Sequence, residues 1–254
     1  MLHLIYRITR QDLTDRHSGS TLGQLWLVLG PLVQVGIFTL IFGGLLSARL
    51  GADASEYDYA TFLIAGILPW AAFSNSIVRI TNIYVDKRAI ISKVPVKLWV
   101  FPLCTALSEG IILLATLVLV VLIEVALGKL RIESLVMLPI LVASQQVLAL
   151  ALGSLGAVCA VMIRDMREVV SLGLQLWFWL TPIVYVSAIA PRILREAQGV
   201  NPAYWVVNSY HRVLFESAPL DPVYFSLVLV LGGAGLLLAF VILRRLEKSI
   251  RDLL

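Results

Sequence analysis

Long runs of apolar residues, separated by short polar segments, dominate the chain. A helix needs about 20 consecutive, mostly apolar residues to cross the hydrocarbon core of a bilayer. Six runs reach that length, at about 22–46, 59–82, 98–124, 134–163, 169–190 and 223–243. Four of them contain no Asp, Glu, Lys or Arg, whereas the second ends in Arg79 and the third carries Glu109 and Glu124. The pattern predicts an all-α integral membrane protein with six transmembrane helices, in a single transmembrane domain over residues 1–254.

The composition also indicates a membrane protein. Hydrophobic residues make up 59% of the 254 positions and charged residues 14%, and the mean hydropathy is +0.92. Soluble domains have roughly 45–50% apolar and about 25% charged residues. Cys104 and Cys159 both lie within apolar runs, which favours small core residues over a disulfide or a metal site. Residues 1–20 carry charges throughout, which is not typical of a signal peptide.

The distribution of Lys and Arg predicts the orientation, because these residues concentrate in cytoplasmic loops. With six spans, thirteen of them fall in segments on the side of the N-terminus, and six fall on the opposite side. Both termini are therefore predicted to be cytoplasmic.

The segment between the fifth and sixth runs, residues 187–222, is expected on the outer side. It carries several charges but also many apolar residues. Pro191 and Gly199 suit the beginning and end of one short helix. Asn201 as N-cap and Pro202 as first residue predict a second, amphipathic helix that is too short to span the membrane. Two such helices can form a re-entrant pair, which is either an interfacial hairpin that anchors the fifth span or a lid over an exit pathway.

No motif for catalysis or nucleotide binding is apparent in the sequence. The stretch "GKLR" (128–131) lacks the first glycine and the hydroxyl residue of a phosphate-binding loop, so any ATP and Mg²⁺ must be bound by a partner. His3, His17 and His211 are scattered, and no metal-ligand or Ser/His/Asp spacing accompanies them. We therefore expect a protein that is not an enzyme, without a metal site and without a cofactor of its own.

Two cytoplasmic segments are candidates for contact with the membrane surface or with a partner. Residues 3–17 suit a helix along the membrane surface, with Asp12 and Arg16 one turn apart; a plain basic tail that fixes the topology is the alternative. The loop 85–99 mixes basic and apolar residues, and exposed apolar residues in a charged loop favour a docking surface. Its candidate docking residues are Asp86, Lys87, Arg88, Ile90, Ile91, Lys93 and Pro95.

Polar and aromatic residues within the spans are candidates for a translocation path. Glu109 lies about 16 Å along the third run from its inner end. An ionisable group at that depth indicates a functional site, unless it is a buried partner for Arg79. Aromatic faces with interspersed amides suit sugar rings, although aromatic packing between helices gives the same pattern, and Phe178 and Tyr185 share one face of the predicted fifth helix. The candidate path residues are Trp70, Phe73, Asn75, Glu109, Gln175, Phe178, Trp179 and Tyr185.

Three stretches resemble one family of transport proteins. They are "RITRQDLTDRHSGSTLGQLWLVLGPLVQ" (8–34), "RDMREVVSLGLQLWFWLTPIVY" (164–185) and "NPAYWVVNSYHRVLFE" (201–216). In order and spacing they are similar to the permease subunits of bacterial ABC-type polysaccharide exporters, which move O-antigen, capsule or teichoic acid chains across the cytoplasmic membrane. The resemblance covers essentially the whole chain.

The resemblance implies partners and roles that the residue pattern alone does not supply. It implies a homodimer bound to two copies of a cytoplasmic ATPase, with a lipid-linked polysaccharide as cargo, contact with membrane lipid and no nucleic acid. Residues 3–17 become an interface helix, 86–95 a coupling helix, and 188–216 a pair of gate helices at the outer exit. Glu109 matches a position where relatives often carry a carboxylate. The candidate gate residues are Arg192, Asn201, Pro202, Trp205, Tyr210, Arg212 and Glu216.

The basic inner face offers one further candidate site. Arg10 and Arg16 suit the diphosphate of a lipid carrier, because arginine matches phosphate oxygens with paired donors. The same residues also satisfy the expected topology, so both interpretations stay open.

Other functions fit parts of the pattern. An ABC permease for a small hydrophobic cargo, such as a drug, haem or lipid, would share the six spans, and the aromatics within the spans and the long outer segment favour a polymer. An integral lipid-modifying enzyme is disfavoured because no catalytic cluster is visible. A secondary transporter is disfavoured because no internal repeat is apparent.

Overall fold

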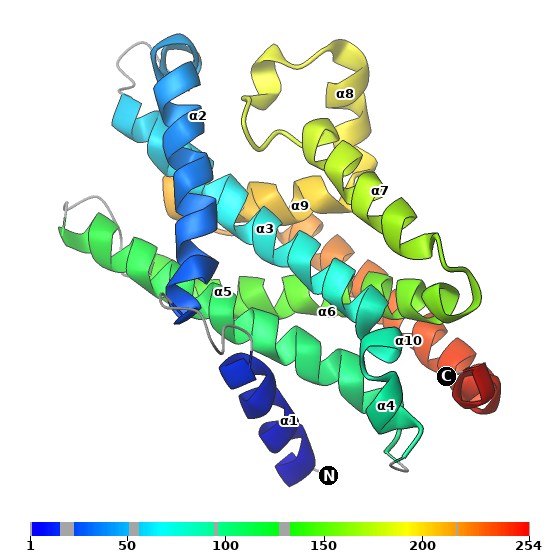
Figure 1. Cartoon of the computed structure of the whole chain (residues 1–254). Coiled ribbons are helices and arrows are strands. Elements are labelled where there is room, and N and C mark those ends of the chain that lie inside the picture. Colours follow the sequence, from blue (N-terminus) through cyan, green and yellow to red (C-terminus); the bar gives the residue numbers. More distant parts are fainter. Residues whose placement is uncertain are drawn as a thin grey trace.

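A computed structural model describes residues 2–15, 23–50, 56–93, 96–126, 133–216 and 218–253. Within these ranges the chain forms helices and connecting turns, without strands (Figure 1). A π-helical segment, His211–Phe215, continues the ninth helix. The helices are α1 (Leu2–Asp15), α2 (Trp26–Leu50), α3 (Glu56–Asp86), α4 (Arg88–Ile91), α5 (Val100–Ala126), α6 (Glu133–Met162), α7 (Met166–Leu180), α8 (Arg192–Ala197), α9 (Pro202–Tyr210) and α10 (Pro222–Leu253).

Four helices in the described part of the chain are long and apolar enough to cross a membrane. The predicted runs at 59–82, 98–124, 134–163 and 223–243 each fall on one of them. The apolar part found in α2 is shorter (Leu32–Ile41), and α7 has only 15 residues. The prediction of an all-α membrane protein is therefore confirmed. The four spanning stretches are Asp58–Asp86 in α3, Val100–Leu122 in α5, Val136–Met162 in α6 and Pro222–Leu253 in α10.

The predicted fifth helix, 169–190, is too long. The helix α7 ends at Leu180, and Thr181 takes an extended conformation (φ −106°, ψ 132°). Pro182 explains this end, because proline disfavours helical backbone at the preceding residue and lacks an N–H for the helix. The predicted shared helical face of Phe178 and Tyr185 is therefore wrong, since the helix stops between them.

The stretch that follows α7 is non-helical but largely buried. Residues 181–184 are buried in the bundle. The hydroxyl of Tyr59, on α3, donates a hydrogen bond of 3.0 Å to the carbonyl oxygen of Val184. Buried backbone of this kind is stable only where its polar groups find partners in the protein.

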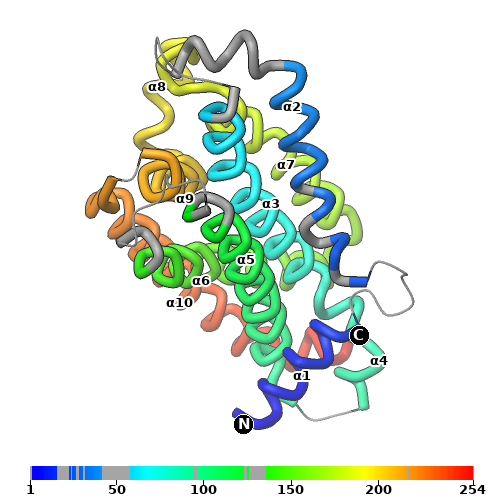
Figure 2. Tube along the Cα trace, turned by 90° about the vertical axis from the view of Figure 1, so that its left-hand side faces the viewer, coloured from blue at the N-terminus to red at the C-terminus, as the bar shows by residue number. Residues whose placement is uncertain are grey.

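The centre of the bundle is the contact between α3 and α6. A Cβ atom added to Gly153 would come 2.7 Å from the Cβ of Ile80, so this crossing needs a glycine. Small residues at helix crossings let two backbones approach closely in membrane proteins. The helices α5 and α10 also pack on α6, and α9 lies against α3 and α10 (Figure 2).

A second group of buried apolar residues joins the helix ends near the two termini. It connects the ends of α3, α5, α6 and α10 with the short helix α4, at the end of the molecule opposite α8 (Figure 1). Its members are Ile83, Tyr84, Ile91, Leu98, Phe101, Ala157, Val158, Leu243 and Ile250.

The N-terminal helix packs along the first part of α5. The thiol of Cys104 donates to the carbonyl oxygen of Ile5 (3.7 Å), and the hydroxyl of Ser108 lies 3.5 Å from the carbonyl oxygen of Thr9. A helix in the predicted segment 3–17 is thereby confirmed over Leu2–Asp15.

Candidate functional site

An open cavity of about 420 Å³ lies between α2, α3 and α7. We call it the α7 groove. Both hydroxyl or amide groups and aromatic rings line its walls, which gives it hydrogen-bonding and apolar surfaces. Its polar residues are Gln34, Ser74, Asn75, Ser171 and Gln175, and its aromatic residues are Trp70, Phe178 and Trp179.

Five of the eight predicted path residues line this groove, namely Trp70, Asn75, Gln175, Phe178 and Trp179. They come from two predicted spans that are about 100 positions apart in the sequence, and the fold brings them to one wall. Phe73 does not line the groove, since it is buried in the core at 1% exposure. Tyr185 lies beyond the end of α7, where its hydroxyl donates to the carbonyl oxygen of Trp179 (3.1 Å).

Ring contacts fix the aromatic wall of the α7 groove. The ring of Trp70 lies 6.2 Å from that of Trp177 in a T-shaped contact and 5.9 Å from that of Phe178. Such aromatic pairs stabilise a helix contact beyond the area that they bury. Packing between helices, one of the two interpretations of the aromatic pattern, is therefore present at this wall, and the lining of a path stays a prediction.

Glu109 lies away from the groove and is ion-paired. Its Oε1 is 2.7 Å from Nη1 of Arg79, and Nη2 of Arg79 is 2.7 Å from Oδ1 of Asp12. The alternative that Glu109 is a buried partner for Arg79 is confirmed, and Glu109 is only 2% exposed. The sequence did not reveal Asp12 as the third member, because its expected partner was Arg16. Arg16 lies outside the described residues.

Asn201 connects the end of α7 to the start of α9. Its Oδ1 accepts hydrogen bonds from the backbone N–H of Ala203 (3.0 Å) and from the indole N–H of Trp177 (2.7 Å). Its side-chain amide donates to the hydroxyl of Thr181 (3.2 Å). The predicted N-cap is confirmed, as is Pro202 as first helical residue. The additional bonds to α7 were not predicted.

The helix α9 is buried rather than interfacial. Trp205 is 7% exposed and Tyr210 is fully buried, so neither candidate gate residue can line an open exit in this conformation. Burial raises the pKa of Tyr210 well above its ordinary value. The reason is that the apolar side of this amphipathic helix packs on α3 and α10, not on lipid.

The remaining candidate gate residues lie on or near the surface. Arg192 and Glu196 form an exposed ion pair along α8 (2.7 Å). Arg212 donates to the carbonyl oxygen of Pro219 (2.9 Å), and this bond holds the turn that leads towards α10. Glu216 is exposed at the end of the π-helical segment.

The π-helical segment holds a buried histidine that the sequence pattern did not single out as a site. Nε2 of His211 lies 3.1 Å from the carbonyl oxygen of Phe62, and the two rings stack with centroids 4.1 Å apart. A carbonyl oxygen only accepts, so Nε2 carries the proton. Burial lowers the pKa of His211 to about 4. A Cβ on Gly66 would come 2.9 Å from Nε2, so a glycine is required opposite the ring.

The candidate docking segment is partly exposed. Ile90 is 45% exposed, but Ile91 is 2% exposed within the apolar group near the termini. The prediction that Ile91 is an exposed docking residue is therefore wrong, because α4 turns this side chain inward. Lys87 is partly buried, and Pro95 lies outside the described residues. The other candidates, Asp86, Arg88 and Lys93, are exposed.

Arg251, from the last turns of α10, fixes the segment around α4. Its guanidinium donates to the carbonyl oxygen of Ile91 (3.2 Å) and to that of Val96. It also lies 3.4 Å from the carboxylate of Glu247. The sequence pattern gave no reason to join the C-terminal helix to this loop.

Membrane-crossing helices around an open, polar and aromatic groove are typical of the membrane component of a transporter. A family model described as "ABC-2 type transporter" matches residues 3–215, and the chain therefore belongs to this family. It is accordingly a transport permease of the ATP-driven ABC class, and membership of that class implies an ABC ATPase as partner.

Curated relatives match over most of the chain. Two proteins from Klebsiella pneumoniae, each named O-antigen export system permease protein RfbA, are 26% and 27% identical over 255 aligned positions, covering 100% of this chain and 96% of each relative. A protein of the same name from Myxococcus xanthus is 27% identical over 215 positions, covering 84% of this chain and 80% of the relative.

Proposed function

We propose that this chain is the membrane subunit of an ATP-driven exporter for a lipid-linked cell-surface polysaccharide of the O-antigen type. The single observation that carries the proposal is the α7 groove, whose walls combine amide and hydroxyl groups with aromatic rings. Sugar rings present apolar C–H faces and hydroxyl edges, which match these two kinds of surface. The names of the relatives support the same cargo. A small hydrophobic cargo would not use the five polar residues.

The groove is open on one side, and we propose that a second copy of the chain closes it. Exposed apolar side chains continue from the groove along both neighbouring helices. Trp26, Leu32 and Val33 on α2 are exposed, as are Leu172 and Leu176 on α7. Two copies that meet along these helices would bury this surface and enclose a path between the protomers. The transporter would then contain two permease chains and two ATPases.

We propose six membrane crossings in one domain over residues 1–254, with both termini cytoplasmic. In this topology α2 and α7 complete the set begun by the four long helices. The 15 residues of α7 span only about 22 Å, less than the hydrocarbon core of roughly 30 Å. The non-helical, largely buried residues 181–186 would cover the remainder. The helices α8 and α9 then form the outer pair, with α9 held inside the protein.

Coupling to the ATPase is assigned to the segment around α4. Ile90 and the charged residues beside it present an exposed surface suited to docking. Movement of this segment would reach the bundle through Ile91 and through the bonds of Arg251 to the backbone on both sides. We propose that ATP binding shifts the two protomers between two arrangements by this route. Arg10, exposed on α1, and Arg16 would attract the carrier's phosphates at the inner face.

Export from intact cells tests the proposal. Gln175→Trp places a bulky ring in the α7 groove, and Val118→Trp places the same ring on the exposed outer face of α5 as a matched control. Cells that depend on Gln175→Trp should lose surface polysaccharide while the protein remains in the membrane. Cells with Val118→Trp should export normally. Normal export by Gln175→Trp would remove the groove from the path.

A further inference from the structure

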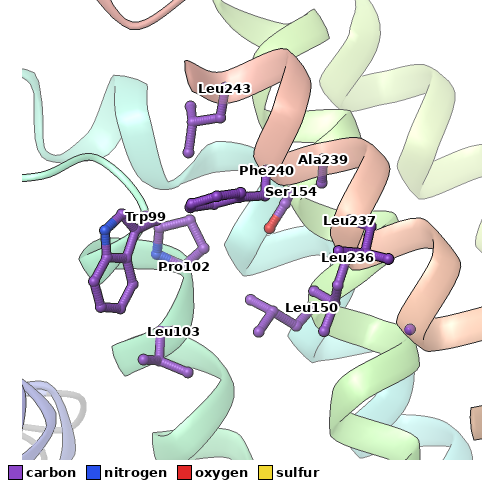
Figure 3. A pocket seen from close by; sticks show the side chains of 11 residues that line it. Trp99, Pro102, Leu103, Leu150, Ser154, Leu236, Leu237, Ala239, Phe240 and Leu243 are labelled. Atoms are coloured by element: carbon purple, nitrogen blue, oxygen red, sulfur yellow. The ribbon is translucent and has the colours of Figure 1, made fainter. Parts of the chain in front are cut away.

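A second, apolar groove lies on another side of the bundle, between the start of α5, α6 and α10. Figure 3 shows Trp99, Pro102 and Leu103 on one side of it and Leu236 and Leu237 of α10 on the other. Its volume is about 570 Å³. We call it the α10 groove. None of its lining residues lines the α7 groove, so the two are separate sites.

The apolar surface of the α10 groove continues along α5 towards the C-terminal end of that helix. A further apolar cavity of about 340 Å³ shares Leu103 and Leu150 with it and continues to Leu114. From Trp99 to Leu114 the rise along the helix is about 22 Å, which exceeds half of a hydrocarbon core of roughly 30 Å. An elongated apolar chain from one leaflet fits such a surface, whereas a compact polar ligand does not.

Cationic and aromatic groups mark one end of the α10 groove. The guanidinium of Arg244 lies over the ring of Phe240, 4.5 Å from its centroid, and Phe240 lines the groove. This cation–π contact holds the charge at the groove's edge. Lys97 is exposed two residues before Trp99 at the same end of α5. Tryptophan at the bilayer interface, beside Arg and Lys, is the usual setting for an anionic headgroup.

We propose that the α10 groove binds one anionic phospholipid, with an acyl chain in the groove and the phosphate on Arg244. Charge complementarity selects this occupant, because the apolar walls end at fixed positive charge. The lipid would lie against α10, which also carries Arg251 and therefore touches the segment around α4. The assignment of this lipid to the inner leaflet depends on the topology proposed above. The existence of the site does not depend on it.

Lipid retention by the purified full-length chain tests this site. The protein is extracted in mild detergent, incubated with phosphatidylglycerol or phosphatidylcholine of equal chain length, and analysed by native mass spectrometry. Wild type should retain one phosphatidylglycerol in preference to phosphatidylcholine. Arg244→Gln should weaken phosphatidylglycerol binding about fivefold, as expected for one cation near a phosphate. Arg245→Gln, an exposed neighbour, serves as the matched control and should bind as wild type does.

A second variant tests the apolar part of the groove. Leu237→Trp fills the groove from an exposed position and should reduce the binding of both lipids. A size-exclusion profile like that of wild type shows that each variant is folded, and Arg244→Lys should restore part of the preference. Equal retention of the two lipids, or equal losses in Arg244→Gln and Arg245→Gln, would overturn the site. No cargo and no ATPase enter this measurement, so its outcome is independent of the export proposal.

Discussion

Arg79 and Glu109 form an ion pair of 2.7 Å that joins α3 to α5 inside the span, and the other guanidinium nitrogen of Arg79 holds Asp12 of α1. One arginine therefore ties the N-terminal helix to two membrane-crossing helices. The carboxylate of Glu109 is almost fully buried, whereas Arg79 retains some exposure. We interpret this triad as an ion-pair network that stabilises the fold, rather than as part of the translocation path.

Removal of one member of the triad should destabilise the fold. Glu109→Leu leaves Arg79 with a single partner and should cost about 3 kcal/mol in unfolding free energy, which thermal unfolding in detergent can detect. The triple variant Asp12→Asn, Arg79→Met, Glu109→Leu should recover most of this loss, because no unpaired charge remains. Glu196→Gln, which breaks only the exposed pair with Arg192, should change little. A triple variant as unstable as Glu109→Leu would show that the loss of stability does not come from an unpaired charge in this triad.

Asn201 should matter more than an ordinary helix cap. Asn201→Ala removes the cap of α9, leaves the indole N–H of the half-buried Trp177 without its acceptor and removes the amide donor to the hydroxyl of Thr181, so we expect a loss of about 2–3 kcal/mol. Asn201→Asp keeps the acceptor for the cap and for Trp177 but loses the donor to Thr181. Its loss should be smaller. If the two variants unfold at the same temperature, the bonds of the acceptor oxygen do not stabilise this junction.

The buried His211 predicts a pH dependence of stability. Its pKa is lowered to about 4 in the folded chain, against about 6.5 when unfolded. The unfolded chain therefore binds the extra proton first, so the contribution is fully present above pH 6.5 and is lost as pH falls towards 4. Between pH 7.5 and 5 the loss should be about 2 kcal/mol. Thermal unfolding at both values measures it.

His211→Gln supplies the control for that pH dependence. Glutamine keeps a donor near the carbonyl oxygen of Phe62 but does not titrate in this range. The difference in stability between wild type and His211→Gln should therefore shift by about 2 kcal/mol on acidification. A difference that is the same at both pH values would mean that His211 titrates normally in the folded chain.

Arg251 should be needed for coupling more than for folding. Arg251→Ala removes the bonds from α10 to the backbone of Ile91 and Val96, and the α4 segment would then move independently of the bundle. We expect the complex with the ATPase to assemble and hydrolyse ATP while surface polysaccharide falls. Lys248→Ala, on the exposed side of the same helix, is the control. An unchanged ratio of export to ATP hydrolysis in Arg251→Ala would show that this contact transmits nothing.

The periodic and compositional parts of the structure could be read from the sequence. Long apolar runs located the four long helices, and Asn201 with Pro202 located the start of α9, because capping is a local property. The end of α7 was local as well. Pro182 lies in the sequence, but an uninterrupted apolar run concealed the break that it makes.

Contacts between distant segments could not be predicted. Asp12 reaches Arg79, and Arg251 reaches Ile91, across 67 and 160 positions. Neither pairing follows from a period of 3.6 residues. The orientation of Ile91 likewise depends on where α10 ends in space, which a single sequence does not encode in any local pattern.

The most direct test of the central claim is ATP hydrolysis by this chain, co-purified with its ABC ATPase and placed in lipid nanodiscs. Turnover is measured with lipid-linked polysaccharide, with small hydrophobic compounds and without additions. The account predicts that the ATPase co-purifies and that the polysaccharide changes its turnover, whereas the small compounds do not. Turnover that responds only to small hydrophobic compounds, or an ATPase that does not bind, would contradict the account.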